Sequence, residues 1–153
     1  MRLFRYALAA LLVAATFAVG NVSAKGKVVP NIYIFGFSAS FSDSIIYMTD
    51  VQKVDSAWID SKTKFLLGRE NYSYQLKDYL ANKLNQQNRT CLVIFGKTRK
   101  DAEKKYLKIK KMYVDKAEGM YDVRYIKDSE FKFQPIDMSI EIGETVTTEA
   151  PLK

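Results

Sequence analysis

The sequence contains no histidine among its 153 residues. Histidine is the usual general base of serine and cysteine hydrolases and a frequent metal ligand. Its absence excludes His-based catalytic triads, histidine general bases and histidine-containing metal sites within this chain. No other pattern in the sequence requires a metal or another cofactor, and we expect none.

Cysteine is nearly absent as well, because Cys91 is the only one. A single cysteine excludes an intrachain disulfide, so the fold must rest on its hydrophobic core. Cys91 lies far from the position directly after an export signal where lipoproteins carry their modified cysteine, so we expect no lipid anchor. It stands at the head of an apolar run, which predicts a buried structural thiol and not a nucleophile.

Only one stretch approaches the length of a membrane span. It covers residues 7–19, after two arginines, and it is too short to cross a bilayer comfortably. Small residues then occupy the two positions that a signal peptidase recognises, in Val22-Ser23-Ala24. The pattern predicts a cleavable export signal over residues 1–24 and a mature protein that is periplasmic or secreted, with no membrane span.

Removal of this signal takes away two of the 24 basic residues and leaves 129 residues with a net charge of +5. That length suits one ordinary domain. A basic exported domain can meet anionic cell-wall polymers, acidic glycans or lipid headgroups, although a charge of this size also keeps a small domain soluble. We expect no nucleic-acid partner, because an exported protein seldom meets RNA.

Four segments have the composition of strands. Residues 31–37 form a nearly continuous apolar and aromatic run, typical of a buried strand. A serine-rich turn over 38–44 leads to β-branched and aromatic residues at 45–51, which predicts a long hairpin. Residues 91–95 are a short apolar run that predicts a central strand, and residues 121–126 alternate like a half-buried strand near an edge.

Two segments have helical spacing instead. Residues 71–87 place their apolar side chains on one side at about 100° per residue. A second helix is predicted to begin after Thr98, which has the spacing of a capping pair with Asp101. An apolar stripe on this helix is formed by Ala102, Tyr106, Ile109 and Tyr113, and the opposite side carries Lys100, Lys104, Lys108 and Lys111.

The predicted order is therefore β-β-α-β-α-β, with no element assigned to the mixed, polar residues 52–70. Strands that alternate with helices can bury one sheet face under two helices. We expect an α+β fold, a two-layer α/β sandwich of ferredoxin-like general shape. It forms a single domain over residues 25–135, and residues 136–153 predict a loose tail.

The stretch from Ile32 to Ser44, followed by Tyr47-Met48-Thr49-Asp50-Val51, resembles small exported proteins of Bacteroidetes bacteria that carry no assigned function. The resemblance covers roughly the whole mature domain. It implies a location in the envelope or outside the cell and transfers no functional site.

The segment from Leu92 to Glu103, with the helix and strand that follow, looks like the strand, helix, strand half of a SPOR domain. SPOR domains bind the glycan strands of peptidoglycan through a sheet and a groove. The likeness implies peptidoglycan as a candidate ligand.

These observations support a first hypothesis, an exported, non-enzymatic binding module. Its partner would be peptidoglycan, another anionic glycan or an envelope protein. The predicted glycan contacts are Lys100, Lys104, Lys108, Lys111 and Arg124. A run of lysines is also the ordinary solvated side of an amphipathic helix.

The alternative hypothesis is a small exported enzyme that uses carboxylate or serine chemistry in the 38–44 loop. Its candidate residues are Ser40, Ser42, Asp43 and Ser44, which are clustered beside an aromatic strand. The other carboxylates in the first half of the chain are scattered through turns and polar segments, without the spacing of a shared site.

Overall fold

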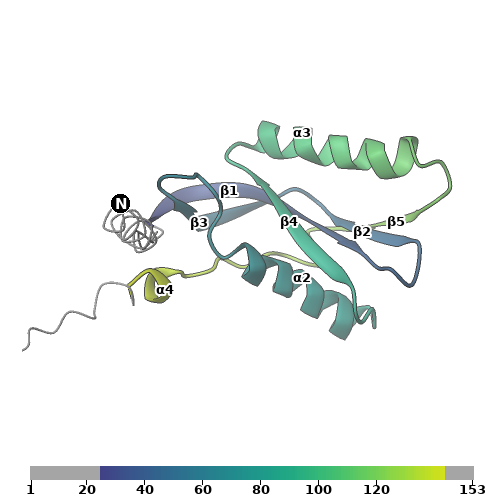
Figure 1. Cartoon of the computed structure of the whole chain (residues 1–153), viewed down its shortest axis with the longest axis horizontal. Coiled ribbons are helices and arrows are strands. Elements are labelled where there is room, and N and C mark those ends of the chain that lie inside the picture. The colour runs from purple at the N-terminus through teal and green to yellow at the C-terminus, as the bar shows by residue number, and fades with distance from the viewer. Residues whose placement is uncertain (1–24, 144–153) are drawn as a thin grey trace, which may run out of the picture.

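A long central strand, β1 (Gly26–Ala39), organises the sheet of this protein (Figure 1). The computed structural model describes residues 25–143, so the predicted export signal and residues 144–153 lie outside the described residues. Side chains of a strand alternate between the two faces of its sheet. Ile32 and Ile34 are buried on one face of β1, and Phe35 and Phe37 are buried on the other. The predicted buried strand is confirmed, and both of its faces are covered.

Two strands run antiparallel to β1 along one of its edges. They are β2 (Ile45–Thr49) and β3 (Gln52–Asp60). The register with β1 shifts by one residue between them, which marks a bulge at residues 49–51. Together β2 and β3 therefore form one bent strand.

The remaining strands complete the sheet on both sides. Strand β4 (Thr90–Gly96) pairs antiparallel with the opposite edge of β1, and β5 (Asp122–Ile126) pairs in parallel with β2. The order across the sheet is β4, β1, the bent β2–β3 strand and β5. The strands predicted at 91–95 and 121–126 are confirmed. However, β4 lies at an edge of the sheet and is not the central strand that the sequence predicts for 91–95, because the longer β1 pairs on both of its edges and takes the central place.

Helix α2 (Arg69–Lys83) covers the face of the sheet that carries Ile32 and Ile34. Its inner side chains Tyr72, Leu76 and Leu80 are 0% exposed. A Cβ at Gly36 of β1 would lie 2.5 Å from Leu76 Cδ2, so a glycine at this position lets α2 approach the strand closely.

Helix α3 (Arg99–Lys110) covers the opposite face and continues into a single π-helical turn, η2 (Lys111–Asp115). The ring of Tyr106 meets that of Phe35 with centroids 5.2 Å apart, and Tyr113 meets Phe37 at 5.0 Å. The predicted apolar stripe of this helix is confirmed as its inner face. Figure 1 shows the two helices on either side of the sheet.

The strand order explains why the helices lie on opposite faces. Strands β3, β4 and β5 all run in the same direction, antiparallel to β1. The connection from β3 to β4 crosses over β1 toward the β4 edge of the sheet. The connection from β4 to β5 crosses over β1 in the opposite direction, toward the β5 edge. Crossovers between parallel strands are nearly always right-handed. Two connections of one hand that run in opposite directions must lie on opposite faces.

The mixed α+β content predicted from the sequence is thus confirmed, whereas the two-layer arrangement with both helices on one face is wrong. The structure has three layers. It also contains one strand more than predicted, because β3 occupies part of residues 52–70, for which the sequence predicts no element.

The segment after β5 returns across the face covered by α2. Phe133 is buried there, and its backbone N–H donates to the buried side chain of Gln52 at 2.9 Å. Met138 is buried as well, and a short helix, α4 (Ser139–Gly143), follows it. Residues 136–143 therefore pack on the domain and are not the loose tail that the sequence predicts for 136–153.

Leu76 and Leu84 fall on the same predicted helix face, yet Leu76 is fully buried and Leu84 is 38% exposed. The substitution Leu76→Ala should lower the free energy of unfolding by about 2–5 kcal/mol, because it leaves a cavity between α2 and the sheet. Leu84→Ala should cost less than about 1 kcal/mol, since less apolar area is lost from the interior. Urea unfolding measures both, and equal losses would contradict this packing.

Candidate functional site

The start of α3 is fixed by its cap and by a glycine. Thr98 Oγ1 accepts a hydrogen bond from the backbone N–H of Asp101 at 3.2 Å, which confirms the predicted cap. A Cβ at Gly96 would lie 2.5 Å from the backbone nitrogen of Ala102. Glycine therefore allows α3 to begin directly against the end of β4, and this contact sets which side of α3 faces outward.

Four of the five predicted glycan contacts share the outer side of α3 and η2. We call this surface the lysine face; it consists of Lys100, Lys104, Lys108 and Lys111. At about 100° per residue the four positions fall within about 80° of the helix circumference. All are exposed, and none has a salt bridge or side-chain hydrogen bond within residues 25–143, unlike Lys105, which pairs with Asp101 at 3.2 Å.

The fifth predicted contact, Arg124, lies elsewhere. It projects from β5 on the face covered by α2, where its guanidinium donates to Tyr47 Oη at 3.5 Å and pairs with Asp122 at 2.7 Å. The structure therefore brings the four lysines together and separates Arg124 from them by the thickness of the sheet.

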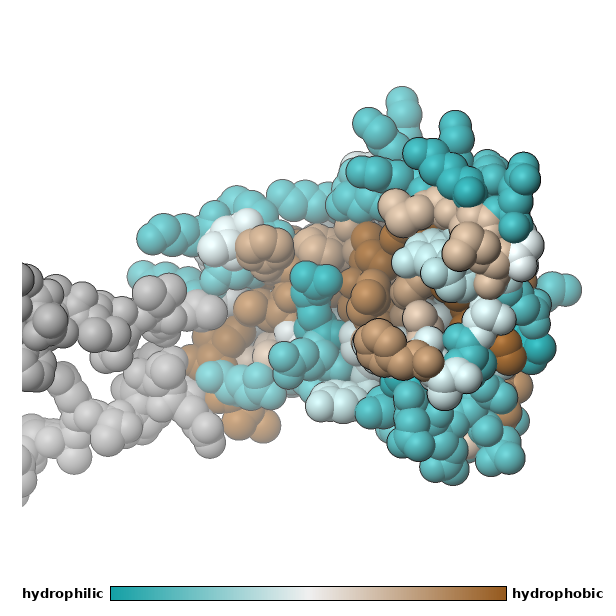
Figure 2. Space-filling model, turned by 45° about the vertical axis from the view of Figure 1, so that its right-hand side comes forward, coloured by the Kyte–Doolittle hydropathy of each residue, from teal (hydrophilic) through white to brown (hydrophobic). Residues whose placement is uncertain are grey.

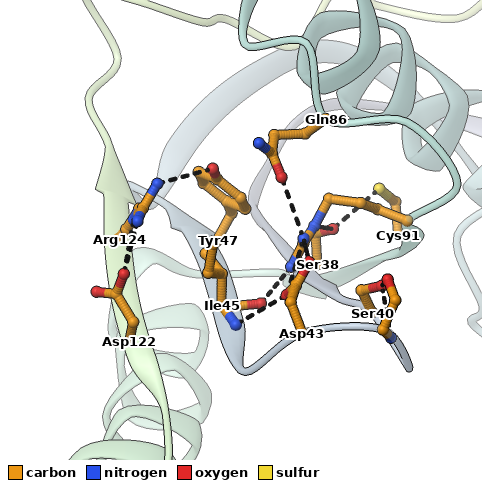
Figure 3. Close-up of polar contacts among 11 residues, drawn as sticks. Ser38, Ser40, Asp43, Ile45, Tyr47, Gln86, Cys91, Asp122 and Arg124 are labelled. Atoms are coloured by element: carbon orange, nitrogen blue, oxygen red, sulfur yellow. Dashed lines mark hydrogen bonds and ion pairs between the residues drawn. The ribbon is translucent and has the colours of Figure 1, made fainter.

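The 38–44 loop is held by Arg89, which precedes β4 and whose side chain is 1% exposed. Its Nη1 lies 2.9 Å from Asp43 Oδ2, and its Nε donates to Ser38 Oγ at 3.3 Å. Nη2 donates to the carbonyl of Ile45, and the guanidinium lies 4.9 Å from the ring centroid of Tyr47. Figure 3 shows these interactions as dashed lines that end on Ser38, Asp43 and Ile45.

The charge of Asp43 is stabilised by this arrangement. The backbone N–H of Ile45 donates to its carboxylate at 2.9 Å. This hydrogen bond, followed by the Arg89 guanidinium, holds the pKa of Asp43 below its ordinary value. A carboxylate with a lowered pKa is a poor general base at neutral pH.

Within residues 25–143, no acidic or basic side chain forms a hydrogen bond with Ser40 or Ser42 of the loop. Ser40 and Ser42 lie on the surface with their hydroxyl oxygens 2.7 Å apart, each the hydrogen-bond partner of the other (Figure 3). The Asp43 carboxylate accepts hydrogen bonds from Arg89 and from the backbone N–H of Ile45. The arrangement closes the β1–β2 hairpin and ties it to the start of β4, which is a structural role.

Cys91 is partly buried, with its thiol 3.4 Å from Ser38 Oγ. Burial raises the pKa of the thiol, so it stays protonated near neutral pH, as the sequence predicts for a structural cysteine. Within residues 25–143 no group of three or more cysteine or carboxylate side chains could hold a metal ion.

An open groove of about 600 Å³ runs beside the outer edge of β4, with residues of α2 along its other wall. Arg69 donates to the carbonyl of Val93 at 3.1 Å, and Lys105 donates to that of Phe95 at 2.8 Å. These carbonyls point away from β1. The two cations therefore occupy acceptors that an additional strand would need.

Two features escaped the sequence analysis. Arg89 gives no local signal, because its partner Asp43 is 46 residues away. Leu107 does give a local signal: it follows Lys104 by three residues and precedes Lys111 by four, so helical spacing places it at the border of the lysine face. It is 60% exposed.

Comparison of the chain with protein-family models, curated proteins and solved structures finds no match. Among the helices of residues 25–143, none has the length and apolar character needed to cross a membrane.

The substitution Arg89→Met should lower the free energy of unfolding by about 1–3 kcal/mol for each buried partner that it leaves without a hydrogen bond. Arg99 offers a matched control, because its ion pair with Glu103 is solvent-exposed on both sides. Arg99→Met should cost less than about 1 kcal/mol. Urea unfolding at neutral pH compares the two, and a similar loss for both would rule out the central structural role of Arg89.

The lowered pKa of Asp43 also predicts a pH dependence. The stabilisation is fully present above the unfolded-state pKa of about 3.9 and is lost as the pH falls through the lower folded-state value. The stability difference between wild type and Asp43→Asn should therefore be largest near neutral pH and shrink below about pH 4. Urea midpoints across this range test it, and a difference that stays constant into strong acid would contradict the assignment.

Proposed function

We propose that the mature chain is an exported, non-enzymatic binding module that attaches to a negatively charged component of the bacterial envelope through the lysine face. The observation that carries the proposal is the exposure of four neighbouring lysines that have no acidic partner within residues 25–143. Like charges gathered on one side of a helix raise the local positive potential and attract an anionic surface.

The lysine face is also independent of the core. The inner side of α3 packs Tyr106 and Tyr113 on the sheet, so the outer side contributes little to folding. A change of charge there alters the surface and leaves the packing intact, which makes the proposal testable by substitution.

The enzyme hypothesis has no comparable support. Asp43 is bound to Arg89, and Ser40 and Ser42 bond to each other at the surface. A serine nucleophile needs a neighbouring base, and no base lies within hydrogen-bond reach of these serines among residues 25–143.

Peptidoglycan, or another anionic glycan, is the polymer predicted from the sequence. Because helices cover both sheet faces, such a polymer would meet α3 from outside or enter the groove beside β4. The groove contains Glu70 beside its cations, whereas the lysine face contains lysines without paired carboxylates. The lysine face is therefore the better site for a polyanion.

The mature protein, residues 25–153, should sediment with isolated bacterial envelope fragments at moderate salt. Substitution of all four lysines of the face by glutamate should reduce binding at least about tenfold, because each lysine near an anionic surface contributes roughly 1 kcal/mol. Sedimentation with lipid-free peptidoglycan then tests the glycan separately.

A control variant has the same net charge as the first variant, because it also replaces four exposed lysines by glutamate. These lysines lie outside the lysine face, at Lys27, Lys62, Lys83 and Lys127. It should bind nearly as well as wild type. Equal weakening of both variants would show that only total charge matters, and a wild-type protein that stays in the supernatant with every fragment would overturn the proposal.

A further inference from the structure

Exposed apolar side chains border the lysine face on one flank. Lys110 lies over the ring of Tyr125 on β5 at 5.3 Å, whereas Lys105 on the other flank reaches Phe95 on β4. Leu107 and Val114 are three residues before and four residues after Lys110, so they share the flank that faces β5. Their exposures are 60% and 39%, and that of Tyr125 is 44%.

The turn between η2 and β5 extends this apolar surface. Met120 is 67% exposed, and the ring of Tyr121 lies against that of Tyr113, with centroids 5.2 Å apart. The backbone N–H of Asp122 donates to the carbonyl of Ser44 at 3.0 Å, which places the tip of the β1–β2 hairpin beside this turn. Phe41, at that tip, is fully exposed.

We call these residues the apolar flank; they are Phe41, Leu107, Val114, Met120, Tyr121 and Tyr125. Figure 2 shows one side of the molecule on which hydrophobic residues lie between hydrophilic residues above and below. The exposed apolar groups and the cations thus meet on one side of the protein.

The presence of lysines and exposed apolar side chains on one surface indicates which class of ligand fits it. A glycan provides anionic and hydroxyl groups for the lysines but no hydrocarbon for leucine, methionine and phenylalanine side chains. An anionic bilayer provides both, because its headgroups attract lysines while apolar side chains enter the acyl boundary. Tyrosine favours the depth between these two regions.

We propose that the lysine face and the apolar flank together dock the protein on the surface of a bilayer that contains anionic phospholipid. The proposal rests on the proposed function, since it names the negatively charged component that the lysine face binds. It adds that insertion of the apolar flank is required. The protein lies on the membrane and does not span it.

The test uses vesicles of phosphatidylcholine alone and vesicles of equal parts phosphatidylcholine and phosphatidylglycerol. The mature protein should sediment with the anionic vesicles and stay in solution with the neutral ones. The triple variant Phe41→Ser, Leu107→Ser, Met120→Ser should bind the anionic vesicles at least about tenfold more weakly, because it removes three apolar groups from the interface.

A matched control places the same change on exposed apolar residues away from the flank, with Phe65→Ser, Tyr74→Ser and Ile140→Ser. It should bind anionic vesicles like wild type. Circular dichroism and urea unfolding establish that both variants remain folded, as expected for substitutions at side chains that are more than half exposed.

The outcomes separate the two proposals. Unchanged vesicle binding by the folded Phe41/Leu107/Met120 variant would overturn insertion and leave charge attraction alone. Retention on lipid-free peptidoglycan with no binding to anionic vesicles would overturn the lipid assignment and keep the proposed function. Failure to bind envelope fragments, peptidoglycan and vesicles alike would overturn both.

Discussion

The burial of both faces of β1 is the constraint on which the rest of the structure depends. A strand with isoleucines on one face and phenylalanines on the other needs cover on both sides. Helices α2 and α3 provide that cover, each with one apolar side. Because α3 uses Tyr106 and Tyr113 to cover the phenylalanines, its opposite side takes no part in the core. The lysine face is possible because of this division of roles.

Arg89 forms the buried hydrogen bonds that join the start of β4 to the β1–β2 hairpin. A buried guanidinium is costly unless its donors are satisfied, and here two oxygens of the β1–β2 hairpin, the Asp43 carboxylate and the ring of Tyr47 all meet it. Removing any one partner leaves the others arranged around an incompletely paired charge. The cluster thus specifies how the hairpin closes, and it gives Ser38 and Asp43 of the 38–44 loop a structural role.

The sequence predicted correctly those helices and strands in which buried side chains recur at a constant spacing from end to end. The strand β4, the capped start of α3 and its aromatic stripe all follow from neighbouring residues. Strand β3 could not be predicted in this way, because Ser56 has a φ of 54° and interrupts the alternation of buried and exposed side chains. Gln52 and Val54 are buried before it, and Ala57 and Ile59 are buried after it. The faces covered by the two helices depend on strand order, and the Arg89 cluster depends on residues far apart in the chain. Neither is encoded in a short window.

The closed edge of β4 has a consequence for self-association. Sheets that join edge to edge grow into fibrils only if each molecule offers two usable edges, since one edge receives a neighbour and the other passes the pairing on. Arg69 and Lys105 already occupy the outward carbonyls of Val93 and Phe95. Strand pairing through β5 would therefore stop at a pair of molecules, which protects the protein from polymerising along this sheet.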